Sequence, residues 1–232
     1  WRQAPFAQEQ HHAGLNLPGL HELSPGGREA ETVARELARM GDMGAPEPAS
    51  VAIVYDYPSS WMTSIQPQGR DFCYHELAFR WYEAVRQLGL DVDFVPPGAP
   101  LDGYALVLVP SLVTVSEAAL AAFAAAQAVI LIGPRTGSRT ANGAIPENLG
   151  PGPLADLCGL RVTEVSSLRP GLTYAVEGEV AGRALRWRDH VETQAETLAT
   201  FSDGRPALVR NGGVHYLACW PDQTLLRSTM EH

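Results

Sequence analysis

Short apolar runs alternate with longer stretches of helical periodicity through the middle of the chain. The runs are rich in β-branched residues, which is typical of strands covered on both faces of a parallel sheet. The helical stretches carry apolar residues at steps of three and four. This pattern predicts strands at residues 51–57, 91–97, 104–111 and 128–133, and helices at residues 71–88 and 114–127. Such alternation indicates an open, doubly wound sheet with helices on both faces.

Both predicted helices have recognisable ends. In the first, Trp81 and Val85 belong to one apolar stripe, and Gly89 stands where a helix C-terminus favours glycine. In the second, Thr114 and Glu117 have the spacing of a capping box, and strong helix formers follow them. These signals set the expected bounds of the two helices.

Turn-forming residues flank this region. Residues 1–26 contain several Gly and Pro residues without a usable period, whereas residues 28–40 have helical spacing. Residues 41–50 form a turn-rich linker and a candidate domain boundary. We expect residues 59–69 to form a long loop.

The regular alternation ends after residue 133. A long loop and a short helix at residues 154–158 are expected first, followed by segments that alternate as antiparallel strands do. Residues 204–220 have the pattern of a hairpin with Asn211 and Gly212 at its turn, and a helix is expected to start near residue 221.

Composition narrows the class of protein. The chain has 232 residues, of which 45% are hydrophobic, so it can bury a sizeable core. Its net charge is -9 without a basic cluster, which argues against nucleic-acid binding. No apolar run reaches the ~20 residues of a membrane span. We therefore expect a cytoplasmic protein with neither nucleic acid nor membrane as its partner.

The sequence offers no strong catalytic or cofactor motif. Cys73, Cys158 and Cys219 form no CxxC pair, and each is interpreted as a buried small hydrophobe. The turn at residues 133–135 has neither Ser nor Cys where a nucleophile elbow would need one. The loop that continues to residue 140 lacks the spacing of a phosphate-binding motif, and we expect Arg135 and Arg139 to meet carboxylates across an interface or in a neighbouring segment instead. No metal and no cofactor are predicted.

The first residues contain side chains typical of a sugar site. Trp1, Arg2, Glu9 and His12 combine an aromatic face with charged and hydrogen-bonding groups. Residue types alone favour a solvated chain end over such a site. A metal site is not expected here, because adjacent His residues point apart on most backbones and no HExxH motif is present.

Successive segments of the chain resemble one enzyme family. "WRQAPFAQEQHHAGL" resembles a segment at the end of the catalytic barrel in glycoside hydrolase family 42 β-galactosidases. "VAIVYDYPSSWMTSIQPQG", "ILIGPRTGSRT" and "ENLGPGPL" are similar to landmarks of that family's trimerisation domain, and "GRPALVRNGGVHYLACWPDQTLL" to the passage into its small C-terminal β domain. The resemblance covers nearly the whole chain in order.

The resemblance implies a fold and a division into domains. The fold is α/β, of the flavodoxin-like or class I glutamine-amidotransferase-like type, with a doubly wound, mostly parallel sheet. A small antiparallel β extension follows at the C-terminus. Residues 1–26 would be the end of the barrel with its linker, residues 27–200 the trimerisation domain, and residues 201–232 the start of the C-terminal domain.

The resemblance also implies a function. The expected role is a trimerisation module of a β-galactosidase, without catalytic residues and inactive alone, because both catalytic carboxylates of the family lie earlier in the barrel. By resemblance, Glu9 and His12 bind galactose in the full-length enzyme, and Trp1 belongs to the wall of the barrel. We expect Trp61, Met62 and Ile65 to anchor a homotrimer, because Trp and Met are enriched at interfaces; local packing of the loop is an equal alternative.

Two other classes of function stay open at this stage. One is an amidotransferase or PfpI-like hydrolase with the same sheet, which would need a reactive Cys at an elbow. The other is a stand-alone sugar-binding module that uses the first residues of the chain.

Overall fold

The computed structural model describes residues 14–42, 44, 48–67 and 69–232, which belong to two compact units, Trp1–Glu47 and Pro48–His232. The first unit contains helix α1 (Pro25–Met40). The Ser24 hydroxyl caps α1 by accepting a hydrogen bond from the Gly27 amide at 3.0 Å. The predicted helix is therefore confirmed and begins three residues earlier than its periodicity indicated.

The second unit is an α/β structure whose eleven strands form one mixed sheet. Its strands are β1 (Val51–Val54), β2 (Val92–Val95), β3 (Leu106–Val109), β4 (Val129–Ile132), β5 (Leu160–Ser167), β6 (Tyr174–Gly178), β7 (Gly182–Thr193), β8 (Glu196–Phe201), β9 (Pro206–Asn211), β10 (Val214–Leu217) and β11 (Cys219–Pro221). Its helices are α2 (Tyr57–Ile65), α3 (Tyr74–Gln87), α4 (Glu117–Ala125), the 3₁₀ helix η1 (Gly152–Leu154), α5 (Ala155–Cys158) and α6 (Gln223–Glu231).

Five parallel strands form one half of the sheet, in the order β10-β4-β3-β1-β2. All four predicted strands of the middle region are among them. β1, β3 and β4 are almost wholly buried, as their continuous apolar sequences predict. β2 lies at the edge of the sheet and is only half-buried.

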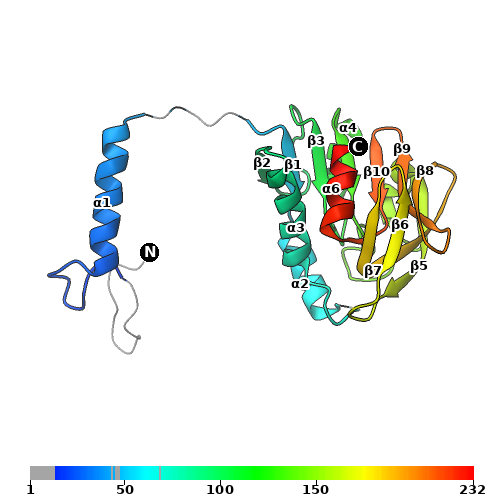
Figure 1. Ribbon diagram of the computed structural model, residues 1–232, viewed down its shortest axis with the longest axis horizontal. Coiled ribbons are helices and arrows are strands. Elements are labelled where there is room, and N and C mark those ends of the chain that lie inside the picture. The colour runs from blue at the N-terminus through cyan, green and yellow to red at the C-terminus, as the bar shows by residue number, and fades with distance from the viewer. Residues whose placement is uncertain (1–13, 43, 45–47, 68) are drawn as a thin grey trace. The chain divides into compact units, whose positions relative to one another are not determined.

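The other half of the sheet is antiparallel and is larger than the resemblance implies, although the alternation after residue 133 predicted antiparallel strands there. The chain leaves β4, builds β5 to β9, and returns to add β10 beside β4. In the sequence, strands β5 to β9 therefore lie between the parallel strands β4 and β10. The expected small antiparallel extension at the C-terminus is thereby corrected. The twelve-residue strand β7 pairs with β5, β6 and β11. β9 pairs with β10, so the antiparallel strands belong to the same sheet as the parallel ones. Figure 1 shows these strands in yellow to orange.

The core of this unit is rich in tryptophan. Trp81, Trp187 and Trp220 are each no more than 1% exposed. Phe72 packs edge-on against Trp187 and Trp220, with ring centroids 5.7 and 5.0 Å apart. Because Trp81 lies on α3 and the other two on β7 and β11, helix and sheet share one core. α6 closes it beside α3, with Leu225 and Leu226 fully buried.

An ion pair fastens α3 to the sheet. Arg186 of β7 donates to both carboxylate oxygens of Glu76, at 2.6 and 2.8 Å, and its guanidinium lies 4.6 Å from the Trp220 ring centroid. Arg186 has a positive φ of 50° where the register between β7 and β11 shifts. The bulge thereby turns a strand residue towards the helix. The Arg186 contact lowers the pKa of the Glu76 carboxyl.

Three local predictions are corrected. Of the loop expected at residues 59–69, residues 59–65 belong to α2 (Tyr57–Ile65), which also includes the end of the strand expected at residues 51–57. The cap of α4 is Ser116, whose hydroxyl accepts from the Ala119 amide at 3.1 Å, while Thr114 instead bridges to Arg139. β6 was not predicted, because Tyr174–Gly178 is short and interrupted by turn residues on both sides.

Candidate interaction surface

Helix α2 begins at a well-formed N-terminal cap. The Asp56 carboxylate accepts hydrogen bonds from the Ser59 amide at 2.8 Å and from the Ser59 hydroxyl at 2.6 Å. Pro58 lies in the first turn, where its missing N–H costs nothing. A cap and a proline at these positions explain why the segment is helical although its apolar pattern does not predict a helix.

The buried and exposed faces of α2 are inverted relative to an ordinary surface helix. Its buried side chains are Ser59, Ser60 and Thr63. Tyr57, Trp61 and Ile65 are 61%, 62% and 77% exposed, and their spacing of four residues places them along one face. We call these three residues the α2 ridge. The segment 57–65 contains no charged residue. An exposed apolar face without charge is characteristic of a surface that is covered in an assembly.

Hydrogen bonds hold the buried face of α2 in place. The Ser59 hydroxyl accepts from the Val113 amide at 2.9 Å, which joins α2 to the loop after β3. The Thr63 hydroxyl donates to the Ser59 carbonyl at 2.9 Å. The Ser60 hydroxyl and His75 Nε2 are 2.9 Å apart, which joins α2 to α3. These hydrogen bonds fix the buried face of α2, and with it the position of the ridge.

Aromatic rings continue from the ridge across the edge of the sheet. Trp61 contacts Tyr57, Tyr57 contacts Tyr55, and Tyr55 contacts Phe94 of β2, with centroid separations of 6.5, 5.3 and 6.0 Å. Phe94 then contacts Tyr82 of α3 at 5.9 Å. Phe94 is 52% exposed, so this edge also presents apolar surface to solvent.

The pairing of Ser60 with His75 resembles part of a nucleophile and base arrangement, and the sequence did not predict it. His75 Nδ1 bonds to the Tyr55 hydroxyl, where a catalytic triad would place a carboxylate. Ser60 is only 3% exposed, and its amide is engaged by the Asp56 carbonyl. A buried hydroxyl without substrate access cannot act as a nucleophile. These residues therefore connect two helices.

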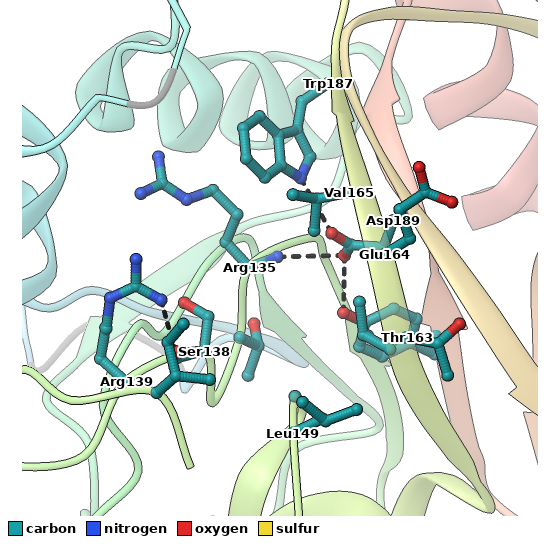
Figure 2. A pocket seen from close by; sticks show the side chains of 14 residues that line it. Arg135, Ser138, Arg139, Leu149, Thr163, Glu164, Val165, Trp187 and Asp189 are labelled. Carbon is teal, nitrogen blue, oxygen red and sulfur yellow. Dashed lines mark hydrogen bonds between the residues drawn. The ribbon is translucent and has the colours of Figure 1, made fainter. Parts of the chain in front are cut away.

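A cavity of about 200 Å³ opens beside β5 (Figure 2). The loop after β4, strand β5 and the inner residues of β7 and β10 surround it. We call it the β5 pocket, and its lining includes Arg139, Ile145, Leu149, Glu164 and Val165. Two of its apolar lining residues, Ile145 and Val165, are 65% and 47% exposed, so the pocket presents apolar surface to solvent.

A buried carboxylate lies at the base of this pocket. Asp189 accepts from Trp187 Nε1 at 2.9 Å, from the Tyr216 hydroxyl at 2.8 Å and from the Arg135 amide at 3.2 Å (Figure 2). Burial raises the pKa of the Asp189 carboxyl, although the three donors and the Arg135 charge act in the opposite direction. Asp189 links β7, β10 and the loop after β4, which is a structural role.

The loop after β4 is held by hydrogen bonds to the loop after β3. Its amides are already bonded: Gly137 donates to Leu112 at 2.8 Å and Arg139 donates to Val113 at 3.0 Å. These amides are therefore not available to bind a phosphate.

Within this chain, the guanidinium groups of the two arginines of this loop bond to carbonyls and not to carboxylates, and their expected contact across an interface stays a prediction. The Arg135 guanidinium bonds to the carbonyls of Gln66 and Pro67 at 3.1 and 3.0 Å, and only its amide meets a carboxylate. Burial lowers the pKa of Arg135 to about 10. The Arg139 side chain donates to the Ser138 carbonyl at 2.8 Å instead of to a carboxylate.

The cysteines give no nucleophile at the expected elbow. Cys158 and Cys219 are buried, and burial raises the pKa of Cys158 to about 12 and that of Cys219 well above its ordinary value. Cys73 is exposed at the start of α3, which corrects its interpretation as a buried residue. Arg135 occupies the elbow, with a positive φ of 63°.

The structure brings together some of the predicted site residues. Trp61 and Ile65 share the α2 ridge, whereas Met62 is half-buried, with its methyl group 3.9 Å from where a Cβ at Gly143 would lie. Trp1, Glu9 and His12 lie outside the described residues. Within the described ranges, no group of three or more His, Cys, Asp or Glu side chains is placed to hold a metal ion. No helix in the described part of the chain is long and apolar enough to span a membrane.

Comparison with known proteins gives a consistent result. The family model of the β-galactosidase trimerisation domain matches residues 49–232. A β-galactosidase of Thermus thermophilus is 49% identical over 228 residues, which are 97% of this chain and 35% of that protein.

Solved structures agree with the sequence comparison. The β-galactosidase of the psychrophilic Marinomonas ef1 superposes with a TM-score of 0.86 at 40% identity, over 99% of this chain and 36% of that one. The β-galactosidase of Halorubrum lacusprofundi superposes with a TM-score of 0.83 at 34% identity, over 100% of this chain and 36% of that one. The chain thus spans about a third of the length of the relatives it matches.

Proposed function

Because this chain belongs to the family of β-galactosidase trimerisation domains, we propose that it joins three copies of itself into a homotrimer. The observation that carries the proposal is the inverted helix α2. Ser59, Ser60 and Thr63 are buried and hydrogen-bonded, whereas the large apolar side chains of the helix are exposed. In a monomer the apolar side chains of the ridge stay in contact with water, whereas an interface would bury them. Trp61, Met62 and Ile65 are the proposed anchors.

Light scattering coupled to size-exclusion chromatography tests the assembly. We expect micromolar protein to elute with three times the chain mass of 25.0 kDa. A single species with the mass of one chain, unchanged up to the highest soluble concentration, would refute the proposed trimer.

We further propose that the longer protein hydrolyses terminal β-galactosides, with its catalytic carboxylates outside this chain. The relatives named as β-galactosidases are about three times as long, and a retaining glycosidase needs two carboxylates ~5 Å apart. Glu9, His12 and Trp1 are the proposed galactose contacts of the longer protein. Purified chain should not cleave a chromogenic galactoside. Cleavage at an enzyme-like rate would disprove the proposal that the catalytic carboxylates lie outside this chain.

The parallel half of the sheet supports a flavodoxin-like assignment for the fold. Counted along the chain, its five strands have the order 2-1-3-4-5, which is the flavodoxin-like order. The large antiparallel insertion before the last of these strands is the departure from that type. The division at residues 26/27 and 200/201 concerns neighbouring domains of a longer protein and stays a prediction.

The amidotransferase or PfpI-like alternative is not favoured. Such an enzyme needs a reactive residue at the turn after β4, and Arg135 occupies that turn with its guanidinium bonded to two carbonyls. The sugar-binding alternative depends on Glu9 and His12 and stays a prediction. Calorimetry with galactose should give no heat, since a sugar site needs the rest of its pocket.

A further inference from the structure

A closed ring of three identical chains needs two different surfaces on each chain. Self-complementary contacts pair two copies around a two-fold axis, whereas head-to-tail contacts close a ring. In the proposed trimer, on which this inference rests, two different surfaces of each chain must therefore meet those of its neighbours. The α2 ridge is a convex apolar surface, and the β5 pocket is a concave one.

The β5 pocket fits one large aromatic side chain. A dry cavity of ~150 Å³ takes a benzene molecule, and this pocket has a volume of about 200 Å³. Ile145 and Val165 supply apolar contacts at its mouth, and the Glu164 carboxylate, 66% exposed, supplies a hydrogen-bond acceptor. The Arg139 guanidinium adds a cation that an aromatic face attracts.

Trp61 has the chemistry that this pocket would receive. Among the tryptophans that the structure describes, Trp61 alone is exposed, whereas the other three are buried in the core. An indole combines a large apolar ring with one N–H donor, which usually finds a hydrogen-bond acceptor when it is buried. The Glu164 carboxylate can accept that hydrogen bond, and the flanking ridge residues Tyr57 and Ile65 can cover the mouth.

The two surfaces lie next to each other on one chain. Arg135 lines the β5 pocket, and its guanidinium bonds to the carbonyls of Gln66 and Pro67 directly after α2. Met62 of α2 approaches Gly143, in the same loop as Ile145. Two different surfaces that lie next to each other on one chain can contact two different neighbours around a three-fold axis.

We propose that Trp61 of one copy inserts into the β5 pocket of the next copy, and that this contact repeats around the ring. The occupant of the pocket is thus a second copy of this chain. Trp61→Ser removes the insert, and Val165→Asp places a charge at the mouth of the pocket. Both positions are well exposed, so we expect both variants to fold, as far-ultraviolet circular dichroism would show.

Each variant alone should fall to the mass of one chain at a concentration where the unchanged protein is a trimer. Leu90→Ser and Leu172→Asp are matched controls, because Leu90 and Leu172 are 39% and 46% exposed and lie outside both surfaces. The two controls should remain trimers.

Mixing the two variants gives the decisive measurement. The Val165→Asp chain keeps its Trp61, and the Trp61→Ser chain keeps its pocket, so an equimolar mixture should form a species of two chains. Analytical ultracentrifugation at ten times the trimer concentration would detect it. A contact between identical surfaces would not be restored by mixing.

The outcomes separate this inference from the proposed function. If the unchanged chain is a trimer and both variants remain trimers, the contact is wrong and the trimer stands. If both variants are monomers and mixing restores nothing, the two surfaces do not meet each other and the inference fails. If the unchanged chain is a monomer at every concentration, the proposed trimer itself fails.

Discussion

At the scale of single residues, the buried carboxylate of Asp189 decides how three parts of the chain meet. Its partners come from β7, β10 and the loop after β4, and they lie up to 54 positions from Asp189 in the sequence. Sequence patterns could predict that β7 alternates, but not that one of its acidic residues faces inwards. The need for a carboxylate becomes visible only when Trp187, Tyr216 and the Arg135 amide are seen to lack another acceptor.

Asp189→Asn tests this role. The amide nitrogen of Asn cannot accept a hydrogen bond, so one buried donor loses its acceptor, and we expect a loss of roughly 1–3 kcal/mol in the free energy of unfolding. Because burial raises the pKa of Asp189, the folded state favours the protonated carboxyl. The advantage of the unchanged protein over the variant should therefore narrow as the pH rises above about 3.9.

Urea unfolding between pH 4 and pH 8 measures that advantage. Asp102→Asn is the control, because Asp102 is exposed and its substitution should change the stability little. An advantage that widens with rising pH would show that the ionised carboxylate is the form the fold prefers.

At the scale of elements, the sequence predicted helices and strands well where burial follows apolar periodicity. α3 carries Ala78, Trp81 and Val85 inwards, and β1, β3 and β4 are continuous apolar runs. α2 was missed because its pattern is inverted: Ser59, Ser60 and Thr63 face the protein, and the apolar residues face solvent. A periodicity argument assumes that apolar residues are buried within the chain itself. It fails where a second molecule is expected to bury them.

The cap of α2 should determine how firmly the ridge is held. Asp56→Ala removes the acceptor of the Ser59 amide and hydroxyl, and we expect a loss of about 1 kcal/mol in the free energy of unfolding. Asp56→Asn keeps a capping oxygen and should cost much less. Both variants are compared by thermal unfolding under identical conditions. Equal losses in the two would show that the charge of Asp56, and not its capping geometry, is what matters.

The loop after β4 should tolerate no side chain at Gly137. Gly137 has a positive φ of 63°, and an added Cβ would lie 1.9 Å from the Pro151 carbonyl oxygen. Gly171 has a positive φ of 86° with nothing within 4 Å, so it shares the backbone strain without the clash. Urea midpoints should show that Gly137→Ala costs roughly 2 kcal/mol more than Gly171→Ala. Similar midpoints would mean that the loop can move away from Pro151.

At the scale of the whole molecule, the sequence predicted an α/β unit with antiparallel strands after residue 133, but not that these strands join the parallel ones in a single sheet. Strand direction depends on how distant segments pair, and a run such as β7 alternates in the same way in a hairpin and in a central strand. The return of the chain from β9 into β10, beside β4, joins the two halves into one sheet. The hairpin of β9 and β10 was predicted, but its pairing with β4 requires contact across more than 80 positions, which no local pattern contains.

The single sheet and the helices packed on it predict which parts of the chain can be removed without loss of the fold. All buried hydrophobic residues in the described part of the chain lie from Ala49 onwards, so a chain that begins at Pro48 should keep its cooperative unfolding. Its melting temperature should lie within about 3 °C of the unchanged chain, because a change of 1 kcal/mol shifts a unit of this size by about that much. A chain that ends at Pro221 is the contrasting case: it loses the fully buried Leu225 and Leu226, each worth roughly 2–5 kcal/mol. Calorimetry should therefore show a transition for the first truncation and none for the second. If the first truncation also lost its transition, residues 1–47 would be part of the folding unit, and the sheet with its helices could not be regarded as sufficient for the fold.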